Sequence, residues 1–147
     1  MTENPWQEQL VYFVHRGLSD WQDLEQQIER HGLDQVLLGC RNGRDAWIIS
    51  TYTRLRSRGY PVELVDHFVP GALCIAHRDD IANTPGVWRS FNVAIRADRE
   101  RTFISDLEIV QSPAVVDAPR VYYLPQWPQP ALIPRDPERG DTLERIG

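Results

Sequence analysis

The sequence predicts an α/β fold in which a doubly wound, mostly parallel sheet lies between two layers of helices. Short apolar runs recur along the chain, and several are apolar throughout rather than alternating, which is typical of strands buried on both faces. The first of these runs are separated by segments with helical periodicity. The length of 147 residues suits a single core.

Residues 10–15 (LVYFVH) form the first predicted strand. A helix follows over residues 19–31, where Ser19 and Gln22 have the spacing of a capping box and the apolar residues share one face. Residues 35–40 (QVLLGC) are apolar almost throughout and are predicted to be the second strand.

Residues 44–59 repeat the helical pattern, with Ile48, Tyr52 and Leu55 on one face and arginines on the other. The remaining predicted strands are residues 62–65, 72–76, 91–95, 107–111 and 121–124. These elements make residues 1–124 one domain. The proline-rich residues 125–147 have the composition of a linker or tail.

Composition narrows the class of function. A net charge of −5 argues against a nucleic-acid partner, because such proteins normally carry a basic surface. No apolar run approaches the roughly 20 residues of a membrane span, and the first residues lack the features of a signal peptide. We therefore expect a cytoplasmic protein without a transmembrane segment. Cys40 and Cys74 lack metal-ligand spacing, so no metal and no cofactor is expected.

In an open parallel sheet, ligands bind beyond the carboxyl ends of the strands. Candidate binding residues are therefore those that follow the predicted strands. They are Arg16 and Gly17 after the first strand, Arg41, Asn42, Gly43 and Arg44 after the second, and His77, Arg78, Asp79 and Asp80 after the fourth. Arginines that converge on one edge indicate a polar or anionic ligand, although solvated turns are often charged without binding anything.

Two of these turns carry more specific patterns. In CRNGRD, Asn42 and Gly43 give a tight turn before a helix N-terminus, which favours either a phosphate or sugar-hydroxyl contact or a purely structural turn. The dinucleotide and Walker glycine patterns are absent from the sequence. In HRDD, His77 with Asp79 or Asp80 has the composition of an acid–base pair. The alternative is a helix start capped by Asp79.

The last third of the chain resembles a known family. DLEIVQSP at residues 106–113 resembles the strand that ends the N-terminal domain of two-domain, GT-B type glycosyltransferases. RVYYLPQWPQPALIPRDP at residues 120–137 is similar to the segment that leads into their interdomain linker, with Gln126-Trp127 in place of the usual Asn-Gly. The DAWIISTYTRLR helix, the IAHRDD turn and the tail together resemble cyanobacterial glycosyltransferase-like proteins, a likeness that covers nearly the whole chain.

The resemblance implies a Rossmann-like, three-layer αβα domain that binds the sugar, lipid or glycan acceptor. The nucleotide-sugar donor would bind a C-terminal domain that follows residue 147, so the chain would be inactive alone. On this reading His77 or Asp79 is the base for the acceptor hydroxyl, and the arginines bind acceptor or diphosphate oxygens. The alternative is a free-standing, non-catalytic binding module, which predicts that Trp127 and the prolines pack on the domain or on a second copy. An interdomain linker predicts an exposed tail.

Overall fold

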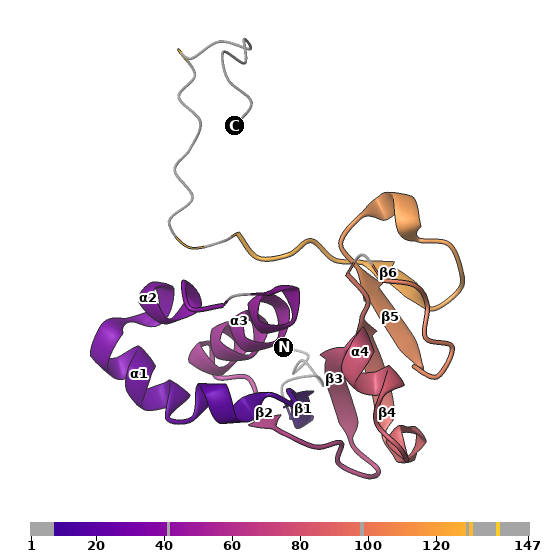
Figure 1. Ribbon diagram of the computed structural model, residues 1–147, viewed down its shortest axis with the longest axis horizontal. Coiled ribbons are helices and arrows are strands. Elements are labelled where there is room, and N and C mark those ends of the chain that lie inside the picture. Colours follow the sequence, from indigo (N-terminus) through magenta and orange to yellow (C-terminus); the bar gives the residue numbers. More distant parts are fainter. Residues whose placement is uncertain (1–7, 41, 98, 129, 131–137, 139–147) are drawn as a thin grey trace, which may run out of the picture.

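A computed structural model describes residues 8–40, 42–97, 99–128, 130 and 138 (Figure 1). Within them, six parallel strands form one sheet in the order β2-β1-β3-β4-β5-β6. The strands are β1 (Val11–Val14), β2 (Val62–Val65), β3 (Leu73–His77), β4 (Phe91–Ile95), β5 (Leu107–Val110) and β6 (Val121–Tyr123). The α/β fold with a parallel sheet, predicted from the sequence, is confirmed.

Helices cover the sheet unequally. The helices are α1 (Leu24–His31), α2 (Leu33–Leu37), α3 (Gly43–Ser57) and α4 (Arg78–Ala82), with single 3-10 turns η2 (Leu18–Trp21), η3 (Val87–Arg89) and η4 (Pro113–Val115). The first three helices gather over the β1–β2 side of the molecule, and α4 lies beside β3 and β4 (Figure 1). The remaining cover comes from the connection between β2 and β3, where Phe68 and Val69 pack on the sheet.

The core has two halves, one on each face of the sheet. Phe13 packs with Ile48 and Ile95 in the half under α1, α2 and α3, which we call the α3 face. Its neighbour Val14 packs with Ile81 in the half under α4. Because successive strand residues point to opposite faces, a strand covered on both sides must be apolar at every position. This explains the uninterrupted apolar run that predicts β1.

The strand predicted at residues 35–40 is wrong, since residues 33–37 form helix α2. Gly32 ends α1 with a φ of 82°, a left-handed conformation that glycine adopts without strain. The chain then re-enters a helix whose Val36 and Leu37 are buried, whereas the next residue, Leu38, is 51% exposed. A short apolar run fits a buried strand and a one-sided helix equally well, and packing against α1 and α3 decides between them.

The capping box predicted at Ser19 and Gln22 does not form. Ser19 lies inside the turn η2, and α1 begins after Asp23, which has a left-handed φ of 61° and makes no side-chain cap bond. The break between η2 and α1 lets Trp21 and Leu24 both point into the core.

The sheet reverses its winding direction between β1 and β3. From β1 the chain passes through α1, α2 and α3 to β2 on one side, and β3 to β6 then follow in order on the other side. In open α/β sheets such a switch point is where ligands bind, because the loops that leave the two strands diverge there. Among the described residues, no helix is long and apolar enough to cross a membrane.

Candidate functional site

Two buried histidines lie side by side at the switch point. His15 directly follows β1, and His77 is the last residue of β3. The register pairs Val14 with Ala76, so the next positions along the two strands are these histidines. Alternation along the strands directs both side chains toward the α3 face, where His15 is 3% exposed and His77 is 7% exposed.

His15 is held at both ring nitrogens. Its Nδ1 accepts a hydrogen bond from the Gly17 amide at 3.0 Å, and its Nε2 lies 2.7 Å from Asp45 Oδ1. Because Nδ1 accepts, the proton of the neutral ring sits on Nε2 and is donated to the Asp45 carboxylate. His15 therefore fixes the position of Asp45 rather than offering a free nitrogen to a ligand.

Asp45 is placed by the start of α3. Its backbone N–H donates to Asn42 Oδ1 at 2.9 Å, and Asn42 Nδ2 donates back to Asp45 Oδ2 at 3.0 Å. This reciprocal pair is an N-terminal capping arrangement with aspartate at the third helical position. The CRNGRD turn thus has a structural role, and it also aims a buried carboxylate at His15.

His77 is the N-cap of α4, a role that the sequence analysis gave to Asp79. The Asp79 N–H donates to His77 Nδ1 at 3.3 Å. No described residue hydrogen-bonds to His77 Nε2. Burial lowers the pKa of His77, which overrides the opposite effect of the nearby Asp79 carboxylate, so the ring is neutral at neutral pH.

An ion pair spans the switch point from α3 to α4. Arg44 Nη1 lies 3.4 Å from Asp80 Oδ1, and Asp80 is only 4% exposed. The other carboxylate oxygen, Asp80 Oδ2, and Arg44 Nε are buried without a hydrogen-bond partner in the described part of the chain. Leaving a buried polar group unpaired costs about 1–3 kcal/mol, so these two atoms have hydrogen-bonding capacity that a ligand or water can use.

Two further arginines border this region. Arg16 Nη1 donates to the Asn83 carbonyl at 3.2 Å and lies 3.4 Å from Thr84 Oγ1, which ties the end of β1 to the end of α4. Arg78 Nε donates to the Glu100 carbonyl at 3.0 Å, and its Nη1 reaches Asp79 at 3.3 Å. Arg78 is therefore turned toward the loop after β4.

The structure brings four of the ten predicted residues into one group, which we call the switch-point cluster. Its members are Arg44, His77, Asp79 and Asp80. Gly17 and Asn42 support this cluster by positioning His15 and Asp45, and Gly43 is the first residue of α3. Arg16 and Arg78 border it, and Arg41 lies outside the described residues.

Sequence reasoning missed Asp45 and the pairing of His15. The Asn42-to-Asp45 spacing is that of a capping box, and this pattern identifies the carboxylate that the helix start holds in place. No sequence pattern places that carboxylate against His15, because thirty positions separate them and only the fold brings them together.

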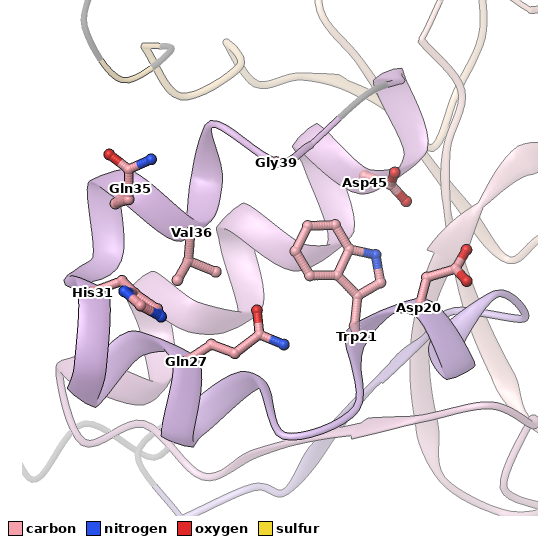
Figure 2. A pocket seen from close by; sticks show the side chains of 8 residues that line it. All are labelled: Asp20, Trp21, Gln27, His31, Gln35, Val36, Gly39 and Asp45. Carbon is pink, nitrogen blue, oxygen red and sulfur yellow. The ribbon is translucent and has the colours of Figure 1, made fainter.

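A cavity of about 670 Å³ lies beside Asp45 on the α1–α2 side (Figure 2). The residues that line it are Asp20, Trp21, Gln27, His31, Gln35, Val36, Gly39 and Asp45. We call it the α1–α2 pocket. Asp45 is the residue that connects it to His15. None of its lining residues was predicted from the sequence as part of a site.

Other reactive groups are less suited to chemistry. Burial and the nearby Asp45 carboxylate raise the pKa of Cys40 to about 11, so its thiol is protonated and a poor nucleophile at neutral pH. Cys74 is buried, and both cysteines are free. In the part of the chain that the structure describes, no three metal-ligating side chains gather in one place.

Comparisons with models of protein families, with curated proteins and with solved structures find no match for this chain. Any function must therefore be argued from the geometry of the switch-point cluster, together with the resemblance stated above.

Proposed function

We propose that this chain is the acceptor-side N-terminal domain of a GT-B type glycosyltransferase that transfers sugar from a nucleotide-sugar donor. The switch-point cluster would hold the acceptor, or diphosphate oxygens of the donor. Such a domain is inactive alone, because transfer requires donor and acceptor to be placed together.

The observation that carries the proposal is the pair of unpartnered polar atoms at the switch point. His77 Nε2 has no hydrogen-bond partner among the described residues, and Asp80 Oδ2 is buried without one. A hydroxyl group both donates and accepts hydrogen bonds, so a sugar hydroxyl suits a site that offers an imidazole and a carboxylate. The adjacent Arg16 and Arg44 suit anionic oxygens.

His77 and Asp79 are also suited to proton transfer. With Nδ1 accepting from the Asp79 amide, Nε2 carries the proton and can only donate. In the other neutral tautomer, Nδ1–H faces Asp79 Oδ2, which lies 3.7 Å away, and Nε2 becomes free to accept the proton of an acceptor hydroxyl. Hydrogen bonds of this kind are often long until the substrate is bound.

One observation favours the alternative, a free-standing binding module. Trp127 Nε1 donates to Thr51 Oγ1 at 3.1 Å, and the guanidinium carbons of Arg54 and Arg58 lie 5.1 and 5.3 Å from its ring centroid. The Trp127 side chain is therefore packed on α3 and half-buried, whereas Pro125, Gln126 and Pro128 beside it are exposed. A domain without a catalytic partner is expected to keep its tail in this way.

The reading frame of the source gene separates the two functions. The glycosyltransferase proposal requires that the frame continues past the codon for Gly147 into a donor-binding domain of about 100–200 residues. A stop codon at that point would contradict it and would favour the binding module.

Transfer by the full-length protein then tests the site itself. We expect His77→Ala and Asp79→Ala each to lower kcat by at least about 100-fold, the usual loss for a general acid–base group. The matched controls are His67→Ala and Asp66→Ala, an exposed histidine–aspartate pair that follows β2, and these should leave kcat unchanged. Unchanged kcat in both cluster variants would overturn the assignment.

A further inference from the structure

We propose that the α1–α2 pocket is a second binding site, and that its ligand carries an ammonium group with a neighbouring hydroxyl. This goes beyond the proposed function, because the carboxylates of the switch-point cluster are paired with arginines, whereas no arginine is among the described residues that line the pocket. It can be tested on this chain without any donor domain.

The pocket has a polar end, an aromatic wall and a volume that suits a small molecule. In Figure 2 the carboxylates of Asp20 and Asp45 lie at one end, His31 and Gln35 lie at the other, and the Trp21 ring stands between them. A volume of about 670 Å³ is within the range of small-molecule sites.

Hydrogen-bond acceptors dominate the lining. Among the described residues, the Asp20 carboxylate has neither an ion-pair nor a hydrogen-bond partner. Gln27 uses its amide nitrogen to bond the Gln22 carbonyl at 3.1 Å, so its side-chain oxygen remains to accept. Asp45 contributes a third acceptor group, since each carboxylate oxygen has a second lone pair beyond those used by His15 and Asn42. A ligand that fits must donate hydrogen bonds.

The charge of the pocket selects a cation. Two carboxylates line it, and no arginine is among its described lining residues, so phosphate or carboxylate ligands are repelled.

The Trp21 indole indicates which group of the ligand lies next to its ammonium group. Trp21 lines the pocket, and its Nε1, which is open to solvent rather than buried, has no hydrogen-bond acceptor among the described residues. Figure 2 places this nitrogen on the side of the ring that faces the two carboxylates. An indole N–H can only donate, so an oxygen beside the ammonium group of the ligand can accept a hydrogen bond from it. A hydroxyl supplies such an oxygen.

Calorimetric titration with matched pairs of ligands tests the proposal. Glucosamine and glucose differ by one ammonium group on the same ring, and ethanolamine and ethylene glycol form a smaller pair. We expect each amine to bind at least about tenfold more tightly than its uncharged partner, the range for a hydrogen bond to a charged group. Asp20→Asn should abolish that difference, whereas Asp34→Asn, an exposed aspartate on α2 outside the pocket, should preserve it.

A gain-of-affinity variant guards against a trivial loss of folding. Gln27→Glu adds a third carboxylate to the lining and should tighten glucosamine binding. Equal binding of the charged and uncharged partners would overturn the proposal and indicate a site for neutral hydroxyl-rich ligands. Absence of saturable binding by either amine, or an effect of Asp34→Asn equal to that of Asp20→Asn, would also overturn it. None of these outcomes bears on transfer at the switch-point cluster.

Discussion

At the scale of single residues, Gly17 is the position where the site leaves least room. A Cβ atom there would lie 3.0 Å from His15 Cε1, and the ring cannot move away freely because Asp45 holds its other side. We expect Gly17→Ala to lower the free energy of unfolding by about 1–3 kcal/mol, the usual cost of overpacking. Chemical denaturation measures this loss.

Gly43→Ala is the matched control for Gly17→Ala. A Cβ at Gly43 meets no atom within 4 Å, and the residue begins a helix, where alanine is preferred to glycine. Its stability should therefore stay the same or rise. Equal destabilisation by the two variants would show that the contact with His15 does not constrain residue 17.

The lowered pKa of His77 predicts how stability depends on pH. Because burial depresses the pKa in the folded state below the ordinary value of 6.5, the unfolded chain takes up a proton more readily. The free energy of unfolding should therefore fall as the pH drops below about 6.5 and level off below the folded-state pKa. His77→Gln removes this part of the dependence, which urea titrations between about pH 7.5 and about pH 5 would detect. If the free energy of unfolding depended on pH equally in His77→Gln and in the parent protein, the dependence could not be attributed to His77.

The residues of the site could be predicted only in part. The turns after the strands indicate Arg16, His77 and Asp80, because the carboxyl ends of parallel strands meet at one edge. Arg44 was also predicted, but from a strand at residues 35–40 that the structure does not contain; it reaches the site from the start of α3. The partner of each residue could not be predicted, since pairs such as Arg44 with Asp80 form between distant segments.

The buried ionic group at β5 could not be predicted for the same reason, since its members lie on separate segments of the chain. Glu108 is 3% exposed, and its Oε2 lies 3.4 Å from Arg96 Nη1 and 3.5 Å from Arg101 Nε. Arg96 also donates two hydrogen bonds to the Asp117 carboxylate. In the sequence Arg96, Arg101 and Asp117 are ordinary loop charges, and Glu108 is a single charge within a predicted strand. Their partners are fixed only when the loops after β4 and β5 close over the sheet.

At the scale of elements, Trp127 of the tail packs on α3, and this contact lies outside the sheet and its two core halves. Two cation–π contacts, each worth about 0.5–1 kcal/mol at a partly exposed site, and one hydrogen bond hold Trp127. We expect Trp127→Ala to lower the free energy of unfolding by about 1.5–3.5 kcal/mol, summed over these contacts.

Trp88→Ala is the control for Trp127→Ala. Trp88 is 74% exposed and has a single arginine over its ring, so its removal should change stability by less than about 0.5 kcal/mol, as for ordinary surface substitutions. If the two variants behaved alike, the tail would not be held on α3. The argument for a free-standing module would then lose its support.

Elements were predictable where their length or burial is distinctive. Helix α3 has fifteen residues, with Ile48 and Tyr52 buried at helical spacing, and the neighbouring strands β1 and β3 carry apolar residues on both faces. Helices α2 and α4 have five residues each, too few for a period to emerge, and their packing decides their conformation. This explains why residues 35–40 were assigned to a strand.

At the scale of the whole molecule, the order of the strands creates the site. Placing β1 and β3 next to each other brings His15 beside His77 and carries the start of α3 across to α4. The sequence predicts a parallel sheet, because the strands need cover on both faces, but it does not contain the strand order. The short connection from β2 to β3 has no helix that could have indicated the crossover.

The central claim is that the switch-point cluster binds a ligand with anionic or hydroxyl oxygens. Titrating the isotope-labelled chain with inorganic pyrophosphate and following its backbone amide resonances tests this most directly. We expect saturable shifts at Gly17, Arg44, His77 and Asp80, with weaker binding in Arg44→Ala. Shifts that spread over exposed arginines such as Arg89, or binding unaffected by Arg44→Ala, would contradict the claim.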